Sequence, residues 1–99
     1  MIHEIATITI RAGDAAAFES AVATAAPLFQ SAKGCHSFGL ERSIEHPERY
    51  RLVVGWESVE DHMVTFRESE DFQKWRALAG PFFASQPEVE HVRKVVDAF

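Results

Sequence analysis

His62 is the side chain of this sequence with the clearest capacity for acid–base chemistry. It lies in the segment WESVEDHMVTFRES, where helical spacing of three and four residues would align it with Val59, Met63 and Phe66. A neutral imidazole on an apolar wall can accept a proton from a bound ligand, because its ordinary pKa lies near neutrality. The alternative is a structural histidine that is hydrogen-bonded to a backbone carbonyl. The residues alone leave both interpretations open.

Five aromatic side chains near His62 could form a slot for a flat ring. They lie within eighteen residues and are Phe66, Phe72, Trp75, Phe82 and Phe83. Core packing is the alternative, and we expect most of them to serve both purposes, with Phe82 or Phe83 at a subunit contact. Arg42 could steady an anionic ligand, although an exposed ion pair of small energetic value is the alternative. His36 and His91 could face either a pocket or a subunit interface.

Composition and spacing argue against several other kinds of site. The net charge is −5 with the five histidines neutral, so no basic surface is expected for nucleic acid or an anionic membrane. The histidines show no H-x-x-x-H or H-E-x-x-H spacing and Cys35 is the only cysteine, so we expect no metal site. No serine has a nucleophile-elbow context, and the five glycines form no phosphate-binding loop. We find no signal peptide and no apolar run of membrane-spanning length, which favours the cytoplasm.

The helices and strands that must position these residues can be predicted from hydrophobic periodicity and from the residues that begin or end such elements. Residues 2–10 alternate and predict a strand, with Glu4 on the same side as Ile2, Ala6 and Ile8. The remaining elements are a helix over 15–31 containing Pro27, strands over 35–43 and 49–57, a helix from Ser58 to about Arg67, a helix over 72–80 and a strand over 88–96. This β-α-β-β-α-β order predicts an α+β, ferredoxin-like fold: one domain over 1–99, with a four-stranded antiparallel sheet and helices on one face.

A sheet covered on one side only leaves its other face bare. Val53 and Gly55 lie on one side of the strand over 49–57, and we expect Phe38 and Leu40 to share a face with His36 in the strand before it. An exposed apolar patch of this kind usually marks an interface. We therefore predict a two-fold homodimer with the sheets face to face.

The sequence also resembles the antibiotic biosynthesis monooxygenase domain family over nearly its whole length. The pieces that carry the resemblance are Gly34-Cys35, Tyr50 to Glu57, Glu60-x-His62, Phe66-Arg67, Phe72 with Trp75, and Val89-Glu90-His91. The resemblance implies a dimeric α+β barrel with a pocket between the sheet and the second helical region. It also implies small oxygenases that act on quinols and polycyclic phenols with molecular oxygen, without flavin, haem or metal.

Some positions depart from the patterns within this family. The haem-degrading branch relies on an asparagine in the first strand, where this chain has Ala6, so haem degradation is disfavoured. Our first hypothesis is a cofactor-independent monooxygenase for a small aromatic, with His62 as the catalytic base and a pocket formed by Phe66, Phe72, Trp75, Phe82, Phe83 and Arg42. The alternative is a non-catalytic dimer that binds a small ligand or acts in a stress response on the same fold. Whether the chain is an enzyme at all stays open at this point.

Overall fold

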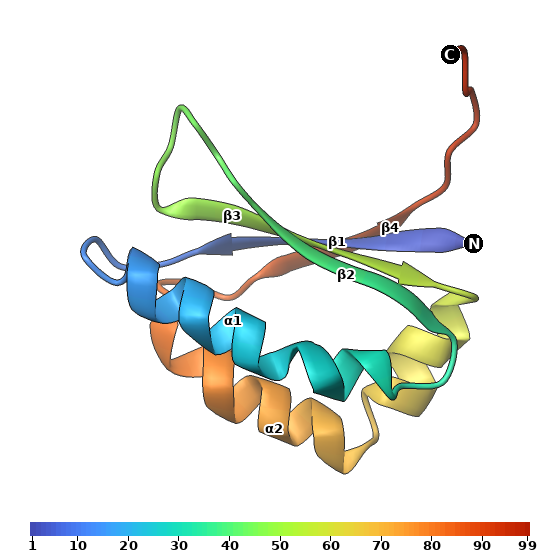
Figure 1. The fold of residues 1–99 in the computed structure, drawn as a ribbon, viewed down its shortest axis with the longest axis horizontal. Helices are drawn as coiled ribbons and strands as arrows, with labels where there is room; N and C mark the ends of the chain where they lie inside the picture. The colour runs from blue at the N-terminus through green and yellow to red at the C-terminus, as the bar shows by residue number, and fades with distance from the viewer.

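The fold is a four-stranded antiparallel sheet with helices packed on one of its faces (Figure 1). A computed structural model describes residues 1–99. Its elements in chain order are β1 (Ile2–Thr9), α1 (Ala15–Gln30), β2 (Cys35–Arg42), β3 (Arg49–Trp56), the π-helix η1 (Asp61–Phe66), α2 (Glu70–Ala79), the 3₁₀ turn η2 (Gly80–Phe82) and β4 (Glu88–Val92). The predicted α+β, ferredoxin-like fold is confirmed, with the second helical region divided as expected. None of the helices has the length and apolar character needed to cross a membrane.

The sheet order is β2-β3-β1-β4, and each neighbouring pair is antiparallel. In the central strand β1, Ala6 lies opposite Leu52 of β3 and Val89 of β4. Residues opposite one another share a face of the sheet. The even-numbered residues of β1 therefore face the helices together with Leu52 and Val89, and this side of the sheet contains the core.

The core is a cluster of fifteen buried apolar residues between the sheet and the helices. Helix α1 contributes Phe18, Val22, Ala25 and Phe29, which helical spacing places on one side. Pro27 lies in the last turn of α1 and does not end it, because the helix continues to Gln30. A proline inside a helix either kinks it or marks its last turn, and here Pro27 marks the last turn.

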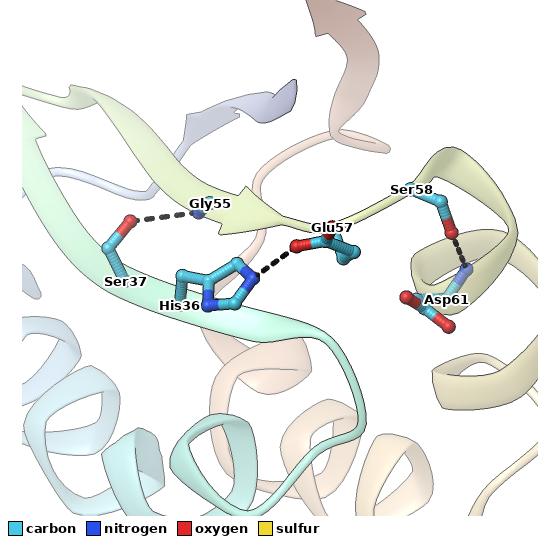
Figure 2. Close-up of polar contacts among 6 residues, drawn as sticks. All are labelled: His36, Ser37, Gly55, Glu57, Ser58 and Asp61. Atoms are coloured by element: carbon cyan, nitrogen blue, oxygen red, sulfur yellow. Dashed lines mark hydrogen bonds and ion pairs between the residues drawn. The ribbon is translucent and has the colours of Figure 1, made fainter. Parts of the chain in front are cut away.

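A β-bulge disturbs the start of β2. The register shifts between Cys35 and Ser37, and the backbone N–H of Gly55 donates to Ser37 Oγ over 3.0 Å (Figure 2). The extra residue is His36, whose Nε2 lies 2.7 Å from Glu57 Oε2. Because a bulge breaks the strict alternation of a strand, His36 does not share a face with Phe38, and that expectation was wrong.

Strand β4 ends at Val92 and not at the predicted residue 96. Val92 lies opposite His3, and β1 begins only one residue earlier, so the chain beyond this point has almost no strand left to pair with. The segment 93–99 extends away from the sheet (Figure 1) and carries the exposed apolar residues Val95, Val96 and Phe99. The bare face of the sheet itself is mixed, since Ile5 and Val53 lie there among charged neighbours.

Candidate functional site

A cavity of about 840 Å³ lies between the helix-covered face of the sheet and the second helical region. Its walls come from β1, β3, η1, α2 and the segment over 83–89. Five of the predicted site residues line it, namely His62, Phe66, Phe72, Trp75 and Phe83. The volume is in the range that small-molecule sites occupy.

Two residues predicted for the pocket, Phe82 and Arg42, do not line this cavity. Phe82 is half-buried and packs edge-on against Phe18 of α1, with ring centroids 6.0 Å apart, and so lies against the core. Arg42 ends β2, where its guanidinium lies 5.6 Å from the centre of the Tyr50 ring and 3.7 Å from Glu19 Oε2. The edge position of β2 carries Arg42 away from η1 and α2, which the spacing of residues along the chain could not indicate.

The apolar wall of the cavity is built from interlocking aromatic rings. Phe29 of α1 lies 4.8 Å from Phe66 and meets Trp75 edge-on at 5.3 Å. Phe66 in turn meets the edge of Phe72 at 5.8 Å. Rings in these edge-on arrangements are held in fixed positions, because each contact favours one orientation of the quadrupoles. A flat aromatic ligand would meet rigid ring surfaces here.

Glu4 is a cavity residue that was not singled out as a candidate from the sequence. Its side chain projects from β1 into the helix-covered side and is only 5% exposed. Trp56 Nε1–H donates to Glu4 Oε1 over 3.0 Å, and His62 Nε2 lies 3.3 Å from the same oxygen. The signal was present in the alternation of residues 2–10, which puts this carboxyl group among isoleucines on the inward face.

His62 is 3% exposed and stacks on the indole of Trp56, with ring centroids 5.2 Å apart and planes 15° from parallel. Its Nδ1 lies 2.8 Å from Nε2 of His91, which β4 presents opposite Glu4. His62 Nδ1 therefore has a hydrogen-bond partner in β4, and Nε2 lies against the Glu4 carboxyl group of β1. The sequence left the direction of His91 undecided, and the register of β4 settles it.

Burial shifts the pKa values of Glu4, His62 and His91 so that each group stays uncharged over a wider pH range than it would in water. Burial raises the pKa of Glu4 to about 7, against the opposing effects of the Trp56 hydrogen bond and the positive charge of Arg67. Burial also lowers the pKa of His62 to about 4, assisted by the nearby His91 and Arg67. The pKa of His91 is lowered by burial and then by Arg67. At neutral pH the imidazole of His62 is neutral, and Glu4 is near the midpoint of its titration.

The π-helix η1 positions His62. The backbone N–H of Arg67 donates to the carbonyl of His62, five residues back, over 3.1 Å. Ser58 caps the segment, since its Oγ accepts from the backbone N–H of Asp61 (Figure 2). The wider winding alters the expected stripe, and Val59 is 45% exposed while His62 and Phe66 are buried. Single π-turns of this kind occur often at functional sites.

Two arginines contribute positive charge to the cavity wall. Arg67 and Arg76 both line the cavity, and their guanidinium groups lie 5.8 Å and 6.0 Å from the centre of the Phe72 ring. No carboxylate lies within ion-pair distance of either of them. Such charges are available to an anionic group of a ligand. No set of three or more His, Cys, Asp or Glu side chains is arranged to hold a metal ion.

Comparison with known proteins gives consistent results. The family described as antibiotic biosynthesis monooxygenase matches residues 1–78. The uncharacterized protein YczJ of Bacillus subtilis (strain 168) is 38% identical over 95 residues, which cover 96% of this chain and 100% of that protein. A crystal structure of a candidate antibiotic biosynthesis monooxygenase from Bordetella bronchiseptica is 56% identical, with a TM-score of 0.95 over 96% of this chain and 97% of the other.

More distant structures share the fold alone. A candidate antibiotic biosynthesis monooxygenase from Nitrosomonas europaea has a TM-score of 0.80 at 17% identity, and it covers 97% of this chain and 100% of its own. The family match spans most of the sequence, and the Bacillus and Bordetella proteins extend the similarity over nearly all of it. The resemblance first seen in the sequence is thereby confirmed. This chain belongs to the antibiotic biosynthesis monooxygenase family.

Proposed function

We propose that the protein is a cofactor-independent monooxygenase that acts on a small aromatic quinol or phenol with molecular oxygen. The observation that carries this proposal is the buried pair formed by Glu4 and His62 beside a cavity walled by aromatic rings. A site with this chemistry needs a group that accepts a proton and a surface that holds a flat ring. Both the proton-accepting group and the aromatic surface lie on the helix-covered side of the sheet.

The reaction would begin with removal of the phenolic proton. The phenolate is electron-rich and can pass an electron to oxygen, and recombination of the two radicals forms a carbon–oxygen bond. Loss of water from the resulting peroxide leaves a quinone, so that one phenol and one oxygen molecule yield one quinone and one water. Exclusion of bulk water favours these steps, because charges interact more strongly in a medium of low dielectric constant.

The remaining cavity residues fit an aromatic anion. Phe66, Phe72, Trp75 and Phe83 would contact the faces and edges of the ring. Arg67 and Arg76 would offset the negative charge that develops on the ligand oxygen. These roles are part of the proposal.

Oxygen uptake with a panel of hydroquinones, naphthalene diols and polycyclic phenols tests the function. We expect uptake with at least one of them, and a decrease of about 100-fold in kcat/KM for His62→Ala, the usual size of an acid–base contribution. His46→Ala is the matched control, since His46 is exposed in the loop between β2 and β3. Absence of uptake across the panel would contradict the proposal.

A ligand-binding protein without catalysis is the second candidate. It is favoured by one observation: His62 Nδ1 is hydrogen-bonded to His91 and Nε2 lies against Glu4, as expected of a structural histidine. Calorimetric titration with the same panel separates the two candidates. Binding of a phenol without any oxygen uptake, with the same affinity in the absence of oxygen, would favour the binding protein.

A further inference from the structure

A chain of three titratable side chains runs from the cavity to the edge strand β4: Glu4, His62 and His91. We infer that Glu4, rather than His62, accepts the phenolic proton of the ligand, and that His62 and His91 conduct this proton to solvent. The inference rests on the proposed function, because it concerns the first step of that reaction.

The geometry places both nitrogens of His62 beside protein groups: Nδ1 is hydrogen-bonded to His91, and Nε2 lies 3.3 Å from Glu4 Oε1. An imidazole has two ring nitrogens, and here Nε2 faces Glu4 while Nδ1 faces His91. To accept a proton from a ligand directly, His62 would have to break one of these contacts while buried and stacked on Trp56. It is therefore better suited to hold Glu4 and to relay a proton than to receive one.

Glu4 has a free oxygen in the right place. The contacts with Trp56 Nε1 and His62 Nε2 both fall on Oε1, and Oε2 makes no hydrogen bond within the protein. Every fully buried side-chain oxygen or nitrogen of the chain has a hydrogen-bond partner. Because Oε2 has no such partner, it must be accessible, and the space beside it is the cavity that Glu4 lines. A carboxylate oxygen held in this way can accept a proton from a phenol hydroxyl.

The chain of three groups can exist in two proton arrangements. In the first, protonated Glu4 donates to His62 Nε2, and His62 Nδ1–H donates to His91 Nε2. In the second, Glu4 is a carboxylate that accepts from His62 Nε2–H, while His62 Nδ1 accepts from His91 Nε2–H and His91 is cationic. A half-turn of the protonated carboxyl group first exchanges the positions of its two oxygens, so that the proton taken up at Oε2 faces His62 Nε2 and Trp56 donates to the other oxygen. Passing from the first arrangement to the second then moves one proton from Glu4 to His91, which releases a proton to water from Nδ1. His91 is only partly buried, so it can reach solvent.

The groups that face Glu4 from the surrounding elements agree with this role. Burial is opposed by the Trp56 hydrogen bond and by the positive charge of Arg67, just after η1, both of which favour the carboxylate, and Arg76 of α2 is a second cation on the same cavity wall. The Cys35 thiol of β2 has a raised pKa, partly through the charge of Glu4, and so stays neutral. His62 and His91 have lowered pKa values and do not retain the proton that passes through them.

The pH dependence of catalysis distinguishes the two possible bases. If Glu4 is the base, kcat/KM rises as the pH increases through about 7, the pKa of its carboxyl group. If His62 is the base, its pKa of about 4 makes kcat/KM level above about pH 5.

We expect the first profile, a loss of about 100-fold in Glu4→Gln, and partial rescue in Glu4→Asp. Glu45→Gln, in the exposed loop between β2 and β3, is the control. A Glu4→Gln enzyme with unchanged kcat/KM and pH profile would overturn the inference.

Infrared spectroscopy tests Glu4 independently of turnover. Spectra of the ligand-free wild-type protein should show the carbonyl stretch of a protonated carboxyl group that disappears as the pH rises through about 7. The band should be missing in Glu4→Gln and displaced in Glu4→Asp. If no aromatic is oxidised and yet this band is found, the proposed oxygenase function fails and the proton-acceptor role of Glu4 fails with it, although the raised pKa of Glu4 stands. If oxygen uptake is found but no carboxyl group titrates near pH 7, the assignment of Glu4 is overturned and the function stands.

Discussion

At the scale of single residues, Glu4 makes the stability of the protein depend on pH in a predictable direction. Its pKa is raised from 4.5 to about 7, so the folded protein keeps a proton that the unfolded chain has lost. This stabilising effect is fully present below pH 4.5 and is lost as the pH rises through about 7. Glu4→Gln does not ionise, so its free energy of unfolding relative to wild type should increase by about 2 to 3 kcal/mol between pH 4.5 and about pH 8.

Urea unfolding at several pH values measures this difference, and Glu45→Gln should show no such trend. The contribution of His62 to stability depends on pH in the opposite direction, because its pKa falls from 6.5 to about 4 in the folded protein. Its contribution is present above pH 6.5 and is lost as the pH falls through about 4. The two effects oppose each other in wild type, and a difference between variant and wild type that stays constant with pH would contradict the raised pKa of Glu4.

Residue chemistry was only partly predictable from the sequence. His62 and four of the aromatic residues, Phe66, Phe72, Trp75 and Phe83, were expected at a pocket because their spacing groups them along the chain. Glu4 and His91 lie far from His62 in sequence, and only the pairing of β1 with β4 brings them to it. Side-chain contacts of this kind depend on strand register, which one sequence does not determine.

At the scale of elements, Gly34 fixes the position of the segment that carries His62. Gly34 precedes β2 with a φ of 77°, and a Cβ there would collide with the carboxyl group of Asp61 at the start of η1. Its carbonyl also accepts from the backbone N–H of Glu57 over 2.7 Å. Gly34→Ala should therefore reduce the free energy of unfolding by at least about 2 kcal/mol, through backbone strain and displacement of η1.

Thermal and urea unfolding of Gly34→Ala measure this loss. Gly80→Ala is the matched control, since Gly80 has helical angles and open space where the Cβ would lie. That variant should be neutral or slightly stabilising, because alanine reduces the freedom of the unfolded chain. Equal stability of the two variants would show that Gly34 and Asp61 are not packed as described.

The elements themselves were well predicted, and their irregularities were not. Strands β1 to β3 and both long helices follow the expected periodicities within one or two residues. Helix α2 begins at Glu70, two residues before the expected start, and Ser69 caps it. The bulge at His36 and the π-winding of η1 were missed. A bulge adds one residue to a strand relative to the strand it pairs with, and a π-turn adds one residue to a helical turn. The amino-acid types at these positions do not indicate either irregularity.

At the scale of the whole molecule, the order of the elements was sufficient to predict the fold. The alternation in the strands and the apolar side of α1 leave few ways to bury these faces, and the β-α-β-β-α-β order favours one of them. The position of the cavity was implied by the family resemblance and not by the residue pattern, since its walls come from segments separated by most of the chain. The length of β4 was overestimated. Val92 already pairs with His3, one residue from the start of β1, so the chain beyond Val92 has almost no strand to pair with.

The last prediction concerns assembly. The bare sheet face and the extended segment 93–99, with Val95, Val96 and Phe99 exposed, leave apolar surface that a second copy could cover. Proteins of this family are typically dimers, which supports the same arrangement here. We expect light scattering after size-exclusion chromatography to give a dimer for the full chain, and a shift toward monomer when residues 93–99 are removed. Ile44→Ser, which changes an exposed apolar residue in the loop between β2 and β3, should leave the dimer intact. A full chain that stays monomeric at all concentrations would contradict the dimer and leave these apolar residues without a partner.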